Sequence, residues 1–112
     1  MSKVAILVQQ EKNLPAVANL AKILSLSLGE ARSRIAEGKP LYEGLLFMNN
    51  HQEVSTRLRS LVTLLEQVEI PFRIFELEED ENFSFAPHDE TEIDSETLEN
   101  ILLEWERRQQ SY

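Results

Sequence analysis

Short apolar runs alternate with helical stripes of apolar residues along residues 1–77 of the chain. Three runs, Lys3 to Val8, Leu45 to Met48 and Phe72 to Leu77, have strand length and predict three buried strands. Between the first two runs, apolar residues recur at positions i, i+3, i+4 and i+7, a spacing that gives a helix one apolar stripe. That stripe consists of Val17, Leu20, Ala21 and Leu24.

Two further helices are predicted within the same region. Ser27 and Glu30 have the spacing of a capping box, and Gly38 followed by Pro40 marks a helix end. The inner face of this helix is expected to consist of Leu28, Ala31 and Ile35. The longest amphipathic stripe stops before Pro71, and its members are Val54, Leu58, Leu61, Val62, Leu65 and Val68.

The resulting order of elements is β-α-α-β-α-β. Three strands with helices on one face form a two-layer α/β sandwich of the α+β type, with a three-stranded sheet. Residues 1–77 are expected to form this domain. Residues 78–112 are expected to add an acidic loop and an amphipathic C-terminal helix, packed on the same domain.

The C-terminal helix is predicted to start at Asp94 or Ser95, after a loop over residues 82–91. Its apolar stripe is formed by Leu98, Ile101, Leu102 and Trp105. This stripe either closes an open side of its own domain or docks in a groove of a partner. A second copy of the chain is one such partner, which would make a homodimer through this helix. In either docking arrangement Trp105 would be an anchor, because Trp is enriched among interface hot spots.

Charge is distributed unevenly along the chain. Residues 1–75 hold nine Lys and Arg and seven Asp and Glu, a net charge of +2. Residues 76–112, here called the acidic segment, hold two Arg and thirteen Asp and Glu, a net charge of −11. Nucleic acids and anionic membranes repel such a segment, so neither is an expected partner. A cationic protein is the partner that this charge pattern favours.

Candidate protein-binding residues follow from this charge pattern and from the last helix: Glu78, Glu79, Asp80, Glu81, Asp89, Glu90, Glu92 and Trp105. An alternative binding face is basic and lies on the first helix pair, with Lys22, Arg32, Arg34 and Lys39. This basic face is either a solvated helix surface, a binding surface, or a surface masked by the acidic segment folding back onto it.

Catalytic and metal-binding chemistry is not predicted. Cysteine is absent, which excludes disulfides and thiolate ligands. Neither His51 nor His88 has a neighbour at a spacing typical of an acid–base or nucleophilic site. The sequence His88-Asp89-Glu90 with Glu92 lacks the alternating ligands of a calcium loop, and the glycines form no phosphate-binding loop. We therefore expect no enzyme, metal or cofactor, and a cytoplasmic location, because the N-terminal apolar run is too short for a secretory signal.

The stretch from Leu26 to Arg32, Leu-Ser-Leu-Gly-Glu-Ala-Arg, follows a Leu/Ala-rich helix and a single strand. It resembles the C-terminal domain of the ribosomal stalk protein L7/L12, and the adaptor protein ClpS looks like the same fold. The resemblance spans residues 3–77 and implies the β-α-α-β-α-β order. In the stalk family, basic residues on the first two helices engage translation factors; Arg32 matches one such position, whereas Gly29 replaces another.

The ClpS family carries an Asn-Asp-Asp turn after the first strand, which helps to hold a substrate's amino terminus. Here the turn is Gln9-Gln10-Glu11, so that pocket is not expected. The leading functional prediction is a non-enzymatic acidic module that caps a cationic protein, as a bacterial immunity protein or toxin inhibitor does. The alternative is a ClpS-like or ribosome-associated adaptor that binds through its first helix pair, and a small enzyme is the third.

Overall fold

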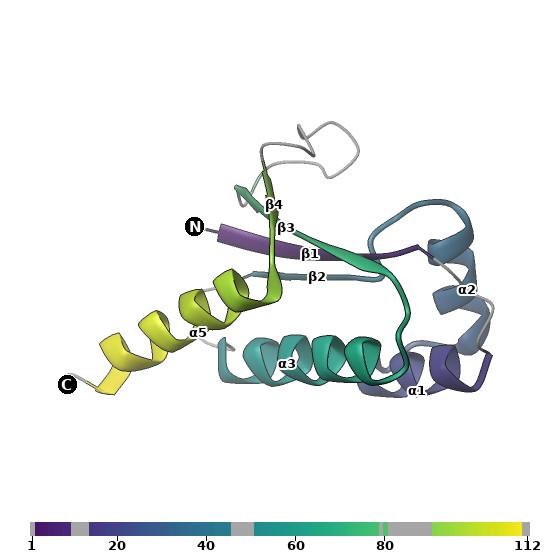
Figure 1. The fold of residues 1–112 in the computed structure, drawn as a ribbon, viewed down its shortest axis with the longest axis horizontal. Coiled ribbons are helices and arrows are strands. Elements are labelled where there is room, and N and C mark those ends of the chain that lie inside the picture. The colour runs from purple at the N-terminus through teal and green to yellow at the C-terminus, as the bar shows by residue number, and fades with distance from the viewer. Residues whose placement is uncertain (1, 10–13, 46–50, 79, 81–90, 111–112) are drawn as a thin grey trace.

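The computed structural model describes residues 2–9, 14–45, 51–78, 80 and 91–110. Its elements, in chain order, are β1 Ser2–Val8, α1 Leu14–Leu24, α2 Leu28–Ala36, β2 Tyr42–Leu45, α3 His51–Gln67, β3 Phe72–Glu78, β4 Glu92–Ile93 and α5 Ser95–Gln110. Helices α1 and α3 lie along one side of the sheet, α2 lies at one end, and α5 extends toward the other (Figure 1). The expected α/β class is therefore confirmed.

In the described part of the chain, the sheet has four antiparallel strands in the order β2-β1-β3-β4, so the expected three-stranded sheet is wrong. The added strand, β4, pairs Ile93 with Ile74 and Glu92 with Phe75. Two residues are too few to show an alternating pattern in sequence, which is why this strand was not expected. The second strand also begins earlier than expected, at Tyr42, because Tyr42 to Leu45 pair with β1.

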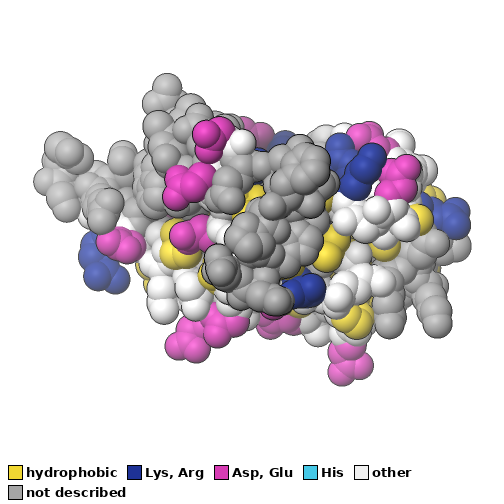
Figure 2. Space-filling view, turned by 90° about the horizontal axis from the view of Figure 1, so that it is seen from above, with side chains coloured by type: hydrophobic (Ala, Val, Ile, Leu, Met, Phe, Trp, Pro, Cys, Tyr) yellow, Lys and Arg dark blue, Asp and Glu magenta, His cyan; other side chains and the backbone are white. Residues whose placement is uncertain are grey.

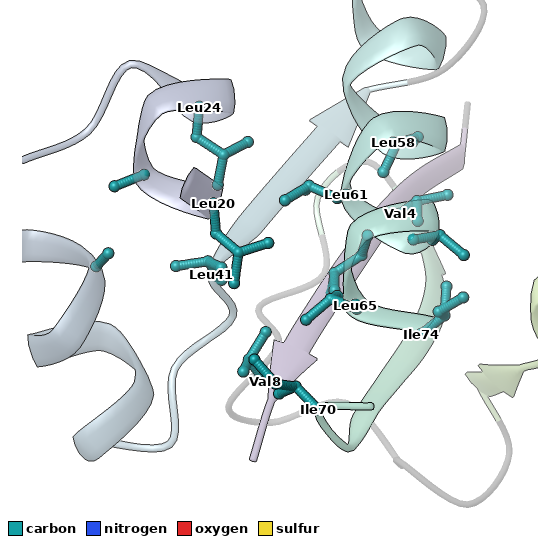
Figure 3. Close-up of a cluster of buried hydrophobic side chains, with 14 of the residues drawn as sticks. Val4, Val8, Leu20, Leu24, Leu41, Leu58, Leu61, Leu65, Ile70 and Ile74 are labelled. Atoms are coloured by element: carbon teal, nitrogen blue, oxygen red, sulfur yellow. The ribbon is translucent and has the colours of Figure 1, made fainter. Parts of the chain in front are cut away.

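The main hydrophobic core lies between one face of the sheet and the helices. Val4, Ile6 and Val8 alternate along β1 toward this side, and all three are buried. Figure 3 shows the side chains of β1 and β3 beside those of α1 and α3, among them Leu20, Leu24, Val4, Leu58, Leu61, Leu65 and Ile74. Helix α5 contributes Leu98 and Leu102 to the same cluster. One core therefore joins both parts of the chain.

The opposite face of the sheet carries a second, smaller cluster. Its buried members are Ala5, Phe75 and Leu77, which occupy the alternate positions of β1 and β3. Ion pairs flank this cluster on both sides, Lys3 with Glu43 and Arg73 with Glu92.

Three helices end in the same way, with one residue in the left-handed conformation followed by a backbone hydrogen bond that closes the last turn. The left-handed residues are Ser25 (φ 58°), Gly38 (φ 70°) and Glu69 (φ 57°). In each case the next amide donates to a carbonyl five residues earlier, at 2.9, 2.9 and 3.1 Å respectively. This is the Schellman pattern, and it confirms the expected helix end at Gly38.

The start of α2 shows one confirmed and one wrong expectation. The Ser27 hydroxyl accepts a hydrogen bond from the Glu30 amide at 3.1 Å, as a capping residue should. Leu28, expected on the inner face, is 41% exposed, whereas Ala31 and Ile35 are buried. The first turn of this short helix extends beyond the edge of the core.

Candidate functional site

Helix α5 is held on the domain by its apolar side. Leu98 and Leu102 are 3% and 0% exposed within the main core. The helix starts as expected, because Asp94 Oδ1 accepts a hydrogen bond from the Thr97 amide at 2.7 Å. The first half of the predicted stripe thus closes its own domain. The side chain of Trp105 lies outside the described residues.

One arginine of α3 joins two carboxylates of α5. Arg59 Nε donates to Glu99 Oε2 at 3.0 Å, and Arg59 Nη1 donates to Glu106 Oε1 at 2.7 Å. The two glutamates lie about two helical turns apart, on the same side of α5. Hydrogen bonds to Glu106 and then to Glu99 raise the pKa of Arg59 above its ordinary value. This contact joins α5 to α3.

A second arginine binds β4. Arg73 Nε donates to Glu92 Oε2 at 2.8 Å, and Arg73 Nη2 donates to Glu92 Oε1 at 3.1 Å, so the ion pair is bidentate. The guanidinium also lies over the Phe75 ring, 5.1 Å from its centre. The hydrogen bond from Arg73 lowers the pKa of the Glu92 carboxyl. Glu92, expected to face a partner, therefore also has an intramolecular role.

A shallow groove opens where β4 passes into α5. Its volume is about 450 Å³, and its lining residues are Phe72, Arg73, Ile74, Glu92, Ile93, Asp94 and Ser95. The Asp94 carboxyl borders this groove. The side chain and the backbone amide of Thr97 donate hydrogen bonds to it, and these lower its pKa. Both carboxyl groups of the groove thus favour their ionised forms.

The remaining predicted acidic residues differ in where they lie. Glu78 and Asp80 are exposed at and just after the end of β3. Glu79, Glu81, Asp89 and Glu90 lie outside the described residues. Glu96 is exposed in the first turn of α5, and among the described residues neither Asp80 nor Glu96 has an ion-pair partner. In Figure 2, the coloured charged side chains on the half of the view nearer α5 are mostly acidic.

The alternative basic face is partly neutralised within its own helix pair. Arg34 donates to Glu30 Oε1 at 2.8 Å and to the Leu41 carbonyl at 3.0 Å. Lys39 lies 3.3 Å from Glu37, while Lys22 and Arg32 are exposed. The ion pairs of β4 and α5 reach Arg59 and Arg73 instead, on α3 and β3.

Groups suited to catalysis or metal binding are not gathered in the described part of the chain. No three His, Asp or Glu side chains converge there to hold a metal ion. Ser55 is the buried polar residue of this part, and its hydroxyl donates to the Gln52 carbonyl within the helix. His88 and the side chain of His51 lie outside the described residues. What this surface offers is charge and hydrogen-bond acceptors on a packed scaffold.

Arg59 and Arg73 were not identified from the sequence as partners of the acidic segment. Arg73 interrupts an apolar strand and Arg59 follows the buried Leu58, so each position indicates a nearby counter-charge.

No helix among the described residues has the length and hydropathy required to cross a bilayer. No protein-family model, curated protein or solved structure significantly matches the chain.

Proposed function

We propose that this chain is a cytoplasmic, non-enzymatic protein-binding module that recognises a cationic protein through its acidic segment. An immunity protein or inhibitor that neutralises a basic toxin is one instance of this class. The partner would be bound by carboxylates that the fold displays but does not neutralise.

The observation that carries the proposal is the division of ion pairs between the two parts of the chain. Within residues 1–75, cations pair with nearby carboxylates: Lys3 with Glu43, Arg34 with Glu30, Lys39 with Glu37 and Arg57 with Glu53. Arg59 and Arg73 reach across to Glu92, Glu99 and Glu106. The segment has a net charge of −11, and among the described residues its exposed Asp80 and Glu96 have no ion-pair partner.

The packing of α5 also supports this proposal. Because Leu98 and Leu102 are buried, carboxylates such as Glu96 are presented from a helix that already has a defined position. Binding then costs less conformational entropy than it would if the carboxylates lay on a flexible tail that had to become ordered. Complementary charge would raise the association rate and discourage anionic competitors. The adaptor alternative has less support, since Arg34 and Lys39 of its binding face are engaged within the helix pair.

The test is to isolate the partner on the immobilised full-length chain and to measure its association rate as a function of salt. We expect a basic partner whose association rate constant falls about tenfold between low and physiological salt, because salt shortens the range of the attraction between the two proteins. Asp80→Lys with Glu96→Lys should slow association. Glu66→Lys, an exposed charge change on α3, should have a much smaller effect. Association that is insensitive to salt and to the paired substitutions would rule out the proposal.

A further inference from the structure

On the edge of β3 beside the groove, the Phe72 N–H and C=O groups make no backbone hydrogen bond to another residue that the structure describes. In an antiparallel sheet, successive residues direct their N–H and C=O groups to alternate neighbours. The Pro71 carbonyl accepts from the Gln9 amide at 3.1 Å, on the β1 side. The backbone N–H and C=O groups of the odd-numbered residues of β3 therefore point toward β1, and those of Phe72 and Ile74 point toward the β4 side.

Strand β4 covers only part of that edge. Ile74 is opposite Ile93, and the next facing position, Phe72, would be opposite residue 95. Helix α5 begins at Ser95, however, and turns away from β3 at this point (Figure 1). The N–H and C=O groups of Phe72 are thus directed into the groove, which Phe72 itself lines.

Charge in and around the groove is negative. Its lining contains the carboxylates of Glu92 and Asp94 and the guanidinium of Arg73. Arg73 is neutralised by its two hydrogen bonds to Glu92, which leaves the charge of Asp94. Glu96, exposed in the adjoining turn of α5, adds a second uncompensated charge. A strand that enters here would meet backbone partners on β3 and carboxylates at the start of α5.

We infer that this groove receives an extended, basic segment of the cationic partner, which pairs with the backbone of β3 at Phe72. The inference rests on the proposed function and specifies how that partner is recognised. Strand addition supplies hydrogen bonds that do not depend on sequence. A Lys or Arg of the segment, placed beside Asp94 and Glu96, supplies the preference for a basic segment. An acidic or neutral strand would gain only the backbone bonds.

The probe is a capped octapeptide of alternating lysine and valine, added to the full-length chain and followed by NMR. We expect slower hydrogen exchange at the Phe72 amide, by about tenfold or more, because the amide becomes paired. Asp94→Asn removes the charge but keeps a side chain that caps helices well, so it should weaken binding by about fivefold without unfolding α5. The same peptide N-methylated at alternate residues keeps its charge but cannot pair, and should lose the effect on Phe72.

Alternative results separate this inference from the proposed function. If both peptides bind equally and perturb only the exposed side of α5, the groove is not the site, although anionic recognition stands. If the lysine–valine peptide does not bind, Phe72 exchange is measured in the complex with the isolated partner. An unchanged Phe72 amide there overturns the groove inference alone. If no cationic partner can be isolated and the peptide does not bind, both proposals fail.

Discussion

Gly44 of β2 lies against Val54 of α3, and the absence of a side chain permits this close approach. A Cβ atom at this position would lie 2.6 Å from Cγ1 of Val54, well inside van der Waals contact. Val54 is buried in the first turns of α3 and cannot move away without disturbing the core. The sequence shows a glycine just before an apolar run, but the reason for it is tertiary.

Gly44→Ala should therefore lower the free energy of unfolding by about 1–3 kcal/mol, measured by urea denaturation. Val54→Ala provides the control, because it removes the methyl groups that would clash. In the double variant the two effects should be less than additive. Strict additivity would show that the contact at this position does not limit packing.

The residues that end the helices in the left-handed conformation differ in how easily they adopt it. Gly38 adopts φ 70° without steric cost, whereas Glu69 adopts φ 57° with a Cβ atom that opposes this conformation. Glu69 is exposed, so its side chain has little packing to lose.

Glu69→Gly should stabilise the protein by about 0.5–1 kcal/mol, because it relieves this conformational cost at the end of α3. Thermal unfolding monitored by circular dichroism measures the effect. Gly38→Ala is the matched reverse change and should destabilise by a similar amount. A loss of stability on Glu69→Gly would contradict this account.

At the scale of elements, β4 and the start of α5 depend on ionised carboxylates. The folded-state pKa values of Glu92 and Asp94 are both lowered, by hydrogen bonds from Arg73 and Thr97 respectively. A carboxyl whose pKa is lower in the folded state stabilises the fold above its unfolded pKa. That contribution is lost as the pH falls through the folded pKa.

Acidification from about pH 5 toward pH 2 should therefore weaken the junction between β4 and α5. The variant Glu92→Gln with Asp94→Asn should be less stable than the parent at neutral pH, and the two should converge in acid. Urea midpoints across this pH range measure the difference. Parallel stability curves would show that these two carboxyls do not contribute through their charge.

At the scale of the whole molecule, the acidic segment is part of the domain and not an appendage. The main core includes side chains from β1, β3 and α1 through α3, together with Leu98 and Leu102 of α5. Arg59 and Arg73 reinforce the same attachment with hydrogen bonds. Removal of the segment would expose apolar surface that it now covers.

Two adjacent leucines test this attachment. Leu102 is fully buried and Leu103 is 41% exposed, so the same substitution should have different effects. Leu102→Ala should lower the free energy of unfolding by about 2–5 kcal/mol, because it leaves a cavity in the core. Leu103→Ala should change it by about 0.5 kcal/mol or less. Urea denaturation of the full-length variants distinguishes them, and equal effects would argue that α5 does not belong to the core.

The local pattern of residues determined most of the elements. Periodic apolar positions predicted the four helices of the described residues, and the signals at Ser27, Gly38 and Asp94 located helix boundaries that the structure confirms. These features are predictable because capping and amphipathicity involve residues within one or two turns of each other. The net charge of the acidic segment likewise depends on composition alone.

Long-range pairing decided the remainder. Strand β4, the early start of β2 and the roles of Arg59 and Arg73 depend on residues brought together from distant parts of the chain. Arg59 and Glu106 are 47 positions apart, so no local spacing of residues predicts their contact. Composition could therefore indicate that the segment is acidic, but only the tertiary structure shows which of its carboxylates are bound internally. Pairing energy depends on distance in space, which a linear pattern does not contain.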